Sequence, residues 1–332
     1  MEISVITAVY NGEEYLMQAV RSILEQSHKD FEYIIVNDGS RDRTKEILDG
    51  MTDPRVKVIH LEQNSGAAHA LNTGIKAARG KWIALQDADD ISSKQRLQKQ
   101  WEYIKGDPGL VAVGSLIKCI GGNEPVAPGE LLWEEAFFNQ KNNLRLYQFY
   151  STPICHGSGF FLKKAFDQIG GYDTSFRIAY DYDLWTRMFE LGEISRVPEV
   201  LYSYRVHKRS LAHKNKMETT KEVLLSTFKC IALLRFNHLK RKPRLIMLGL
   251  ESNFDFYREK LAPFNSYLKL DLLELSAENV QRAAYNYQAR KIDGVILPAY
   301  RQTGTLISYF EQGGLSYGEN LFVAWMPGRG EW

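Results

Sequence analysis

The residues best suited to chemistry in this chain are aspartates that follow short apolar runs. Asp87 and Asp89 flank one alanine directly after the apolar run 82–85. Carboxylate oxygens are the ligands that Mg²⁺ and Mn²⁺ prefer, and such an ion commonly keeps waters and binds substrate phosphates as well. A solvated acidic turn before a helix starting near Ser93 is the structural alternative, and the Asp-x-Asp spacing alone favours that alternative.

Two further side chains follow other apolar runs in the same way. Asp38 comes after residues 31–36 and could accept hydrogen bonds from a base or a ribose, as acidic residues do in dinucleotide-binding folds. An Asx turn with Gly39 explains this residue equally well. Tyr10 comes after residues 3–7 and offers a flat ring for a base, although a packing tyrosine is the simpler explanation.

The elements that must position these residues alternate between two hydrophobic periods. Runs of β-branched and aromatic residues predict strands, whereas apolar residues spaced by three and four predict helices. This alternation predicts an α/β fold with a mostly parallel sheet and helices on both faces. In such sheets ligands bind beyond the carboxyl ends of the strands, which is where the residues named above lie. The expected strands are 3–7, 31–36, 56–60 and 82–85, and the expected helices are 15–24, 44–48 and 67–78.

The rest of the chain is less regular and ends in a second small α/β unit. Residues 106–128 predict short strands and turns because Gly and Pro interrupt them. We expect a first domain over 1–214, a basic helical linker over 215–243 and a Rossmann-like domain over 244–332. No G-x-G-x-x-G occurs there, so dinucleotide binding is not expected. The remaining expected helices are 131–149, 181–191, a stretch after 249, and 304–310, and the remaining strands are 157–162, 245–249, 293–297 and 321–324.

Composition and charge exclude several classes of protein. The 332 residues are 44% hydrophobic and 25% charged, which excludes a disordered chain, a collagen and a disulfide scaffold. The net charge of +2 gives no reason to expect a nucleic-acid partner. Three cysteines without metal-ligand spacing predict reduced thiols and a cytoplasmic location. We expect neither a signal peptide nor a membrane span, because no apolar run approaches the roughly 20 residues that a span needs.

Several motifs then occur in one order along residues 2–212. The segment 4–12 (Ser-Val-Ile-Thr-Ala-Val-Tyr-Asn-Gly), the segment 36–40 (Val-Asn-Asp-Gly-Ser) with Thr44, and the acidic segment 86–90 resemble signatures of the family-2 glycosyltransferases. An ordered set of motifs is far more specific than any one of them. The other matching segments are 64–66, 72–75, 78–80, 157–160, 170–173, 181–185 and 204–207.

The resemblance implies a GT-A-type nucleotide-sugar-binding fold and an inverting sugar transfer. The implied donor is a nucleotide diphosphate sugar, expected to be a UDP-sugar, and the implied cofactor is Mn²⁺ or Mg²⁺. The implied acceptor is a hydroxyl of a glycan or of a lipid-linked molecule in cell-surface polysaccharide or glycoconjugate synthesis. Asp181 aligns with the catalytic aspartate and Asp89 with the metal ligand. The implied nucleotide-sugar-binding residues are Ala8, Tyr10, Asp38, Gly66, Asp87 and His207.

The implied roles agree with what the chemistry requires. Inversion needs one base to take the acceptor's proton, and the departing diphosphate needs a cation to stabilise its charge. Asp181 could instead complement a helix dipole, and Asp183 could equally be the catalytic residue from its position alone. His207 could be a surface histidine in a basic segment. The chain departs from the family pattern at Leu71, where an arginine is common, and at Tyr180, where a glutamate is usual.

The basic stretch 208–244 has two interpretations. It contains eleven Lys or Arg and two Glu, with Leu224, Phe228, Ile231 and Leu234 on one face of an expected helix. A solvated linker helix is the simpler and preferred explanation. Alternatively, the stretch makes a peripheral contact with the anionic inner face of the membrane, with Phe228 and Leu234 towards lipid or protein.

Two other functions compete with sugar transfer. A catalytically silent nucleotide-sugar-binding or scaffold subunit would keep the fold without turnover. A sugar nucleotidyltransferase would want a Gly-rich loop with Lys or Arg after the first strand, and residues 10–14 (Tyr-Asn-Gly-Glu-Glu) offer none. The sugar, the acceptor and the oligomeric state, a homo-oligomer included, are left open by the sequence.

Overall fold

The computed structural model describes residues 2–140, 143–207, 215–299 and 303–325. The chain divides into two compact units, and each is described by itself. The first unit comprises residues 1–145 and 152–214, and the second comprises 146–151 and 215–332. The short segment 146–151 therefore packs with the second unit although both of its flanks belong to the first.

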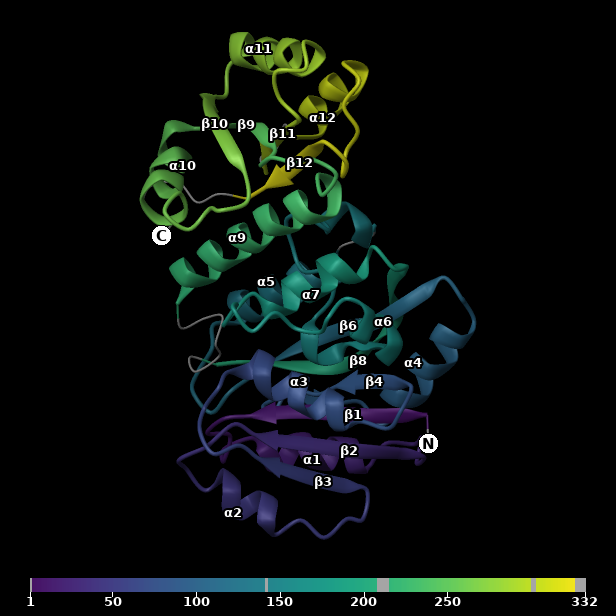
Figure 1. The fold of residues 1–332 in the computed structure, drawn as a ribbon. Coiled ribbons are helices and arrows are strands. Elements are labelled where there is room, and N and C mark those ends of the chain that lie inside the picture. The colour runs from purple at the N-terminus through teal and green to yellow at the C-terminus, as the bar shows by residue number, and fades with distance from the viewer. Residues whose placement is uncertain (1, 141–142, 208–214, 300–302, 326–332) are drawn as a thin grey trace. The chain divides into compact units, whose positions relative to one another are not determined.

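The first unit is built on an eight-stranded sheet (Figure 1). Its strand order is β3-β2-β1-β4-β7-β6-β8-β5, and β3, β2, β1 and β4 are parallel. β7 is antiparallel to both of its neighbours, which makes the sheet mixed. The strands are β1 Ile3–Val9, β2 Phe31–Asn37, β3 Val56–His60, β4 Trp82–Leu85, β5 Ile91–Ser92, β6 Leu110–Gly121, β7 Phe160–Leu162 and β8 Glu193–Val206.

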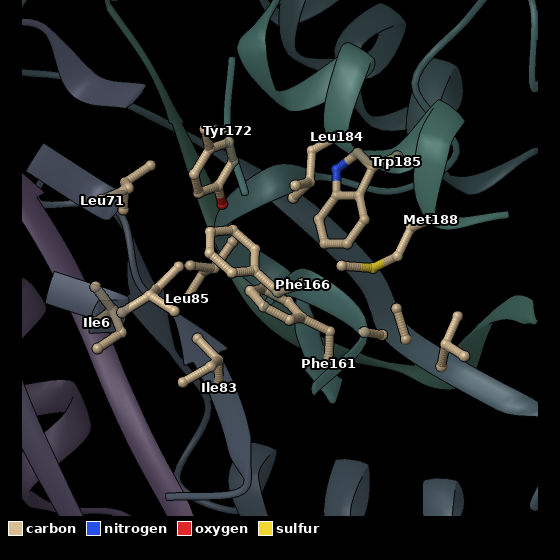
Figure 2. Close-up of a cluster of buried hydrophobic side chains, with 14 of the residues drawn as sticks. Ile6, Leu71, Ile83, Leu85, Phe161, Phe166, Tyr172, Leu184, Trp185 and Met188 are labelled. Carbon is tan, nitrogen blue, oxygen red and sulfur yellow. The ribbon is translucent and has the colours of Figure 1, made fainter. Parts of the chain in front are cut away.

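Helices cover both faces of this sheet, because its central strands are apolar on both sides. Ile6 of β1 belongs to one core cluster, whereas Ile3 and Val5 belong to the other. Figure 2 shows the first cluster, into which Leu71, Phe161 and Trp185 project. The helices are α1 Leu16–Leu24, α2 Thr44–Asp49, α3 Ala67–Ala77, α4 Arg96–Lys105, α5 Pro128–Asn139, α6 Lys163–Gln168 and α7 Tyr180–Met188, with 3₁₀ turns at Leu144–Tyr147 and His156–Ser158.

The α/β prediction is confirmed, and the differences lie in the middle of the chain. Residues 106–128 contain one long strand, β6, instead of several short ones, because its Gly114 packs against Ile154 and does not end the strand. The helix expected over 131–149 ends at Asn139. The strand expected over 157–162 begins only at Phe160, after a 3₁₀ turn. β8 was not expected at all, since polar residues interrupt its apolar pattern.

The second unit is a smaller sheet whose four strands are all parallel. The strand order is β10-β9-β11-β12, which agrees with the small α/β unit expected at this end of the chain. β10 lies in the stretch that was expected to be helical, so that part of the prediction is wrong. The elements are α9 Lys216–Arg235, β9 Arg244–Gly249, α10 Glu251–Phe256, a π-helical turn Tyr257–Leu261, β10 Lys269–Glu274, α11 Ala277–Gln288, β11 Gly294–Pro298, α12 Thr303–Gln312 and β12 Leu321–Ala324.

The apolar face of α9 forms part of the core of this second unit. Leu224, Phe228 and Ile231 are buried there, and Leu234 packs against the same cluster. Phe228 contacts the ring of Tyr257, with 6.3 Å between centroids. Phe228 therefore does not face lipid, and that part of the membrane interpretation is wrong. Residues 208–214 of the basic stretch lie outside the described residues.

One further finding concerns membranes. Within the described ranges, no helix has both the length and the apolar character that a bilayer crossing requires.

Candidate active site

An acidic turn follows β4 at the centre of the first unit's sheet. The chain leaves β4 at Gln86, whose side-chain amide donates to the carbonyl oxygens of Asp87 at 2.9 Å and Asp90 at 3.0 Å. The Thr7 hydroxyl donates to the Gln86 carbonyl at 2.7 Å, which joins the turn to β1. Buried hydrogen bonds thus fix the turn, which is more than a solvated acidic loop would need.

The carboxyl groups of this turn are crowded. Burial, together with the charges of Asp89 and Asp181, raises the pKa of Asp87 to about 7. Asp90 is buried, and burial raises its pKa well above the usual value. The backbone amide of Arg205 donates to Asp90 at 2.7 Å. Carboxyl groups crowded in this way resist ionisation, and a cation beside them would favour their charged form.

Asp89 is the most accessible of these groups and lies against His207. The His207 Nε2 atom is 2.8 Å from Asp89 Oδ2, with side chains 11% and 36% exposed respectively. Arg205 Nε donates to the Asp89 carbonyl at 2.7 Å, so the end of β8 is tied to the acidic turn. The structure thus brings His207 and Asp89 together, although 118 residues separate them in the sequence.

The side chains of the acidic turn supply only part of the ligand set that a divalent ion needs. No set of three or more His, Cys, Asp or Glu side chains converges on one point anywhere in the described chain. The accessible Asp89 carboxylate nevertheless supplies the hard oxygen that Mg²⁺ and Mn²⁺ prefer. Mg²⁺ in particular is commonly held by one or two carboxylates plus substrate phosphates and waters. The donor set therefore suits an ion that arrives with a phosphate-bearing ligand.

The two aspartates at the start of α7 have different environments. Asp183 is fully buried and forms an ion pair with Arg187, whose Nε donates to it at 2.8 Å. Asp181 is partly buried and accepts a hydrogen bond from the Tyr182 amide at 2.7 Å. Burial raises the pKa of Asp181 to about 6. Asp183 therefore stabilises the fold, whereas the carboxyl group of Asp181 can gain or lose a proton near neutral pH.

Asp38 is buried in a separate set of hydrogen bonds beside Gly66. Its carboxylate accepts from Asn64 Nδ2 at 2.9 Å, from the Ser65 amide at 2.8 Å and from the Gly66 amide at 2.9 Å. Gly66 precedes α3 with φ +93°, a conformation that favours glycine. Asp38 thus fixes the loop between β3 and α3, a role that the sequence did not reveal.

Tyr10 and Ala8 lie at the end of β1, next to β2. Tyr10 is 44% exposed, which fits the half-buried packing tyrosine as well as a ring that stacks on a base. Ala8 pairs with Val36 of β2. The Asn11 amide donates to Ser40 Oγ at 2.9 Å, which joins the loops that follow the two strands. Tyr10 thus lies partly exposed just after the carboxyl end of β1.

The predicted residues form two groups at the carboxyl ends of adjacent strands. The charges of Asp89 and Asp181 raise the pKa of Asp87, and the charges of all three aspartates raise the pKa of Tyr180. These aspartates therefore belong to one group, together with His207, which contacts Asp89. Ala8, Tyr10, Asp38 and Gly66 form the second group at the ends of β1 and β2 and on the loop before α3. The strands lie in the order β2-β1-β4, so both groups belong to the same edge. The roles of these residues towards a ligand stay predictions.

Sequence reasoning matched residues 157–160 to a family motif but did not place this loop against Asp87. A Cβ atom on Gly157 would lie 2.5 Å from Asp87 Oδ2 and 2.0 Å from the Tyr202 hydroxyl oxygen, so only glycine fits there. The neighbouring His156 is buried, and burial lowers its pKa to about 3. Its ring contacts those of Tyr172 and Tyr180, with centroids 5.6 Å from each. The glycines of the run His-Gly-Ser-Gly at 156–159 were the available signal.

Comparison with solved structures supports the fold. Staphylococcus aureus TarS, crystallised with UDP-GlcNAc, matches with a TM-score of 0.57 and 21% identity over 71% of this chain and 67% of that one. The mannosyltransferase PcManGT from Pyrobaculum calidifontis, in complex with GDP-Man and Mn²⁺, matches with a TM-score of 0.53 and 22% identity. That match covers 69% of this chain and 63% of the other. At these identities the likeness concerns the fold alone.

Sequence comparison identifies the family. An uncharacterized glycosyltransferase of Haemophilus influenzae is 28% identical over 232 residues, which are 67% of this chain and 71% of that protein. The family model described as "Glycosyl transferase family 2" matches residues 4–170 of the 332. This match includes β1, β2 and the acidic turn after β4. The chain therefore belongs to glycosyl transferase family 2 and is a glycosyltransferase.

Proposed function

We propose that this glycosyltransferase is metal-dependent and inverting, and that it moves a sugar from a nucleoside diphosphate to a hydroxyl group. The observation that carries the proposal is the environment of Asp181. Its carboxyl group has a pKa raised to about 6 by burial, and it lies in the field of the acidic turn. A base with a pKa near the working pH abstracts a proton efficiently.

In the proposed reaction the Asp181 carboxylate takes the proton of the acceptor's hydroxyl. The acceptor oxygen then forms a bond to the anomeric carbon on the face opposite the leaving group. The bond between that carbon and the diphosphate oxygen breaks, and its electron pair leaves with the diphosphate. This single displacement inverts the anomeric centre and needs no enzyme nucleophile.

Asp89 would hold the divalent ion, Mn²⁺ or Mg²⁺, with His207 beside it. Such an ion, when bound, neutralises charge on the diphosphate. Support comes from the accessible carboxylate of Asp89, from the crowding of acids around it, and from the Mn²⁺ in the complex of the Pyrobaculum mannosyltransferase. His207 Nε2, at 2.8 Å from Asp89, is a candidate donor to an oxygen of the departing diphosphate.

The other group of residues would hold the nucleoside. We propose that Tyr10 stacks on the base near the Ala8 backbone, that Asp38 and Gly66 contact the nucleoside, and that Asp87 lies near the ribose. The Asp38 carboxylate already accepts three hydrogen bonds from the loop before α3. We therefore expect the loop as well as the carboxylate to contact the nucleoside. UDP is the expected nucleotide, supported by the UDP-GlcNAc complex of the similar TarS fold.

The acceptor is proposed to be a glycan or a lipid-linked molecule in cell-surface polysaccharide or glycoconjugate synthesis. The proposal includes a cytoplasmic location. Where the acceptor is lipid-linked, residues 208–244 would approach the inner face of the membrane through their eleven Lys and Arg side chains. Leu224, Phe228 and Ile231 of α9 have no part in such a contact, since they are buried in the core of the second unit.

A thermal-shift screen tests the donor and the metal before any acceptor is known. The full chain and the variant Asp89→Ala are heated with UDP, GDP, UDP-GlcNAc or GDP-Man, each with and without Mn²⁺. We expect one nucleotide family to raise Tm, by a larger amount with Mn²⁺, and the Mn²⁺-dependent part to vanish in Asp89→Ala. Equal shifts with and without Mn²⁺ would contradict the metal dependence. A silent binding subunit would show the shift but release no nucleoside diphosphate from the donor.

A further inference from the structure

Arg96, the first residue of α4, carries a guanidinium group that is completely buried in the first unit. A buried charge is costly unless hydrogen bonds and an opposite charge compensate for it. Within the described part of the chain, no carboxylate forms an ion pair with Arg96. The side chain therefore needs another explanation than a buried salt bridge.

Uncharged oxygen atoms surround the guanidinium group. All three of its nitrogens donate hydrogen bonds, and its carbon lies 5.2 Å from the centre of the Tyr202 ring. The group is thus fixed in one orientation by a network in which every donor nitrogen has a partner. The acceptors are Gln100 Oε1 at 3.1 Å, Ser92 Oγ at 2.8 Å, Gln86 Oε1 at 3.3 Å, Gly157 O at 3.1 Å and Leu85 O.

These contacts join the two segments that enclose Asp87. Leu85 ends β4, and the Gln86 side chain donates hydrogen bonds to two backbone carbonyl oxygens of the acidic turn. The backbone amide of Gly157 donates a hydrogen bond to the Asp87 carboxylate, and its loop packs against that side chain. The Tyr202 hydroxyl, above the guanidinium group, accepts a hydrogen bond from the Asp87 amide at 3.2 Å. Arg96 is therefore linked to Asp87 through the end of β4, through Gly157 and through Tyr202, and none of these links is a direct contact with the Asp87 carboxylate.

The position of the charge gives this arginine a role in the acidic turn. Asp87, Asp89 and Asp90 lie within four residues of one another, and Asp90 is buried. Their mutual repulsion works against the folded turn whenever no metal ion is bound. Arg205 also contacts the turn, but its guanidinium group donates to the Asp89 carbonyl and to neutral groups of other segments. The Arg96 guanidinium group donates to the carbonyl oxygens of Leu85 and Gly157, which places its positive charge beside the two segments that enclose Asp87.

We propose that Arg96 is the internal counter-charge of the acidic turn, a positioning residue that holds Asp87 and the Gly157 loop in place before a metal ion binds. It does this through its charge as well as through its hydrogen bonds. This inference concerns the folded protein itself and does not require the transfer reaction.

A double-mutant cycle between Arg96 and Asp87 tests the charge. Thermal unfolding is measured for the full chain, Arg96→Met, Asp87→Asn and the double variant, all without metal. We expect Arg96→Met to lower Tm by several degrees, and Asp87→Asn to recover part of that loss, because the charge that needed compensation is gone. Costs that simply add would overturn the proposal. Should Arg96→Met fail to fold, a folded double variant supports the proposal, and an unfolded one overturns it.

A second comparison uses Mn²⁺ alone, and this arm rests on the proposed function. An ion at the turn supplies positive charge, so Mn²⁺ should raise Tm more in Arg96→Met than in the unmodified chain. Arg187→Met is the matched control, because Arg187 is also largely buried but pairs with Asp183, outside the turn. Its response to Mn²⁺ should equal that of the unmodified chain. Equal responses in all three proteins would overturn the counter-charge; if none responds, the metal assignment fails, and the double-mutant cycle still decides on Arg96.

Discussion

Replacement of Asp181 by asparagine should raise the stability of the protein and remove its activity. Burial raises the pKa of Asp181 from 3.8 to about 6, a difference of about two pH units or about 3 kcal/mol. At pH 8 the folded protein carries this ionised group at that cost, whereas the asparagine of the variant would be neutral in both the folded and the unfolded state. For a unit of roughly 200 residues, 3 kcal/mol corresponds to a Tm increase of about 6 to 12 °C.

The sign of this effect depends on pH, which makes the prediction easy to refute. Because the folded-state pKa lies above the unfolded value, the stability associated with this carboxyl group is full below pH 4 and is lost as pH rises through 6. The Tm difference between Asp181→Asn and the unmodified chain should therefore be near zero at pH 4, increase up to about pH 6 and stay constant above. Thermal unfolding without metal or nucleotide measures it. A difference that is the same at pH 4 and pH 8 would refute the assigned environment.

Activity and a neighbouring variant complete this experiment. Loss of a general base should lower kcat by about 10² to 10⁴, measured as release of nucleoside diphosphate from the donor, while donor binding is kept. Asp183→Asn is the control two residues away. It breaks the buried pair with Arg187 and should lower stability by about 3 to 5 kcal/mol at pH 8. Transfer at an undiminished rate by Asp181→Asn would contradict its assignment as the base.

Three other variants give further tests. Asp89→Ala should abolish the Mn²⁺-dependent part of UDP binding, measured by titration calorimetry, because it removes the accessible carboxylate of the turn; unchanged affinity with Mn²⁺ would contradict the assignment. Asp38→Asn should lower stability by about 1 to 3 kcal/mol in urea unfolding, since the new amide group would face three donors that the carboxylate now accepts from; a smaller loss would mean that the loop does not depend on the carboxylate. Gly157→Ala should lower kcat/KM by about 100-fold, because its Cβ would lie 2.5 Å from Asp87 Oδ2, whereas Gly121→Ala, whose Cβ meets nothing within 4 Å, should leave it unchanged.

The first half of the fold could be predicted because its strands and helices have clear hydrophobic periods. The strands β3 and β4 have the predicted bounds, and β1 and β2 extend the predictions at their carboxyl ends by one or two residues. β1, β2 and β4 are buried on both faces and are rich in apolar residues, whereas β3, with exposed Lys57 and His60, was recognised from its alternating pattern. The turn clusters after these strands predict the edge of the sheet at which a ligand would bind.

Two strands in the second half, β8 and β10, escaped prediction for a physical reason. In β8, Glu193 and Glu199 are exposed and form ion pairs, and the half-buried Arg196 donates to the Asn139 carbonyl, so its sequence has no apolar run of the usual kind. β10 alternates exposed and half-buried residues at the edge of its sheet, and Leu270, Leu272 and Leu273 are equally compatible with a helix. Tertiary contacts, and not local preference, decide these elements.

For the candidate site as well, local motifs could be recognised in the sequence, whereas contacts between distant residues could not. Asp38, Asp87, Asp89 and Asp181 were found because motifs place them directly after strands or at a helix start. The function of Asp38 as the anchor of the Gly66 loop was not visible, since its hydrogen bonds reach residues 26 to 28 positions further along the chain. A carboxylate that holds a loop by three hydrogen bonds keeps little freedom to follow a ligand. Nucleotide recognition at this end of the site should therefore depend on a rigid, preformed loop, and the Asp38→Asn variant should lose affinity and stability together.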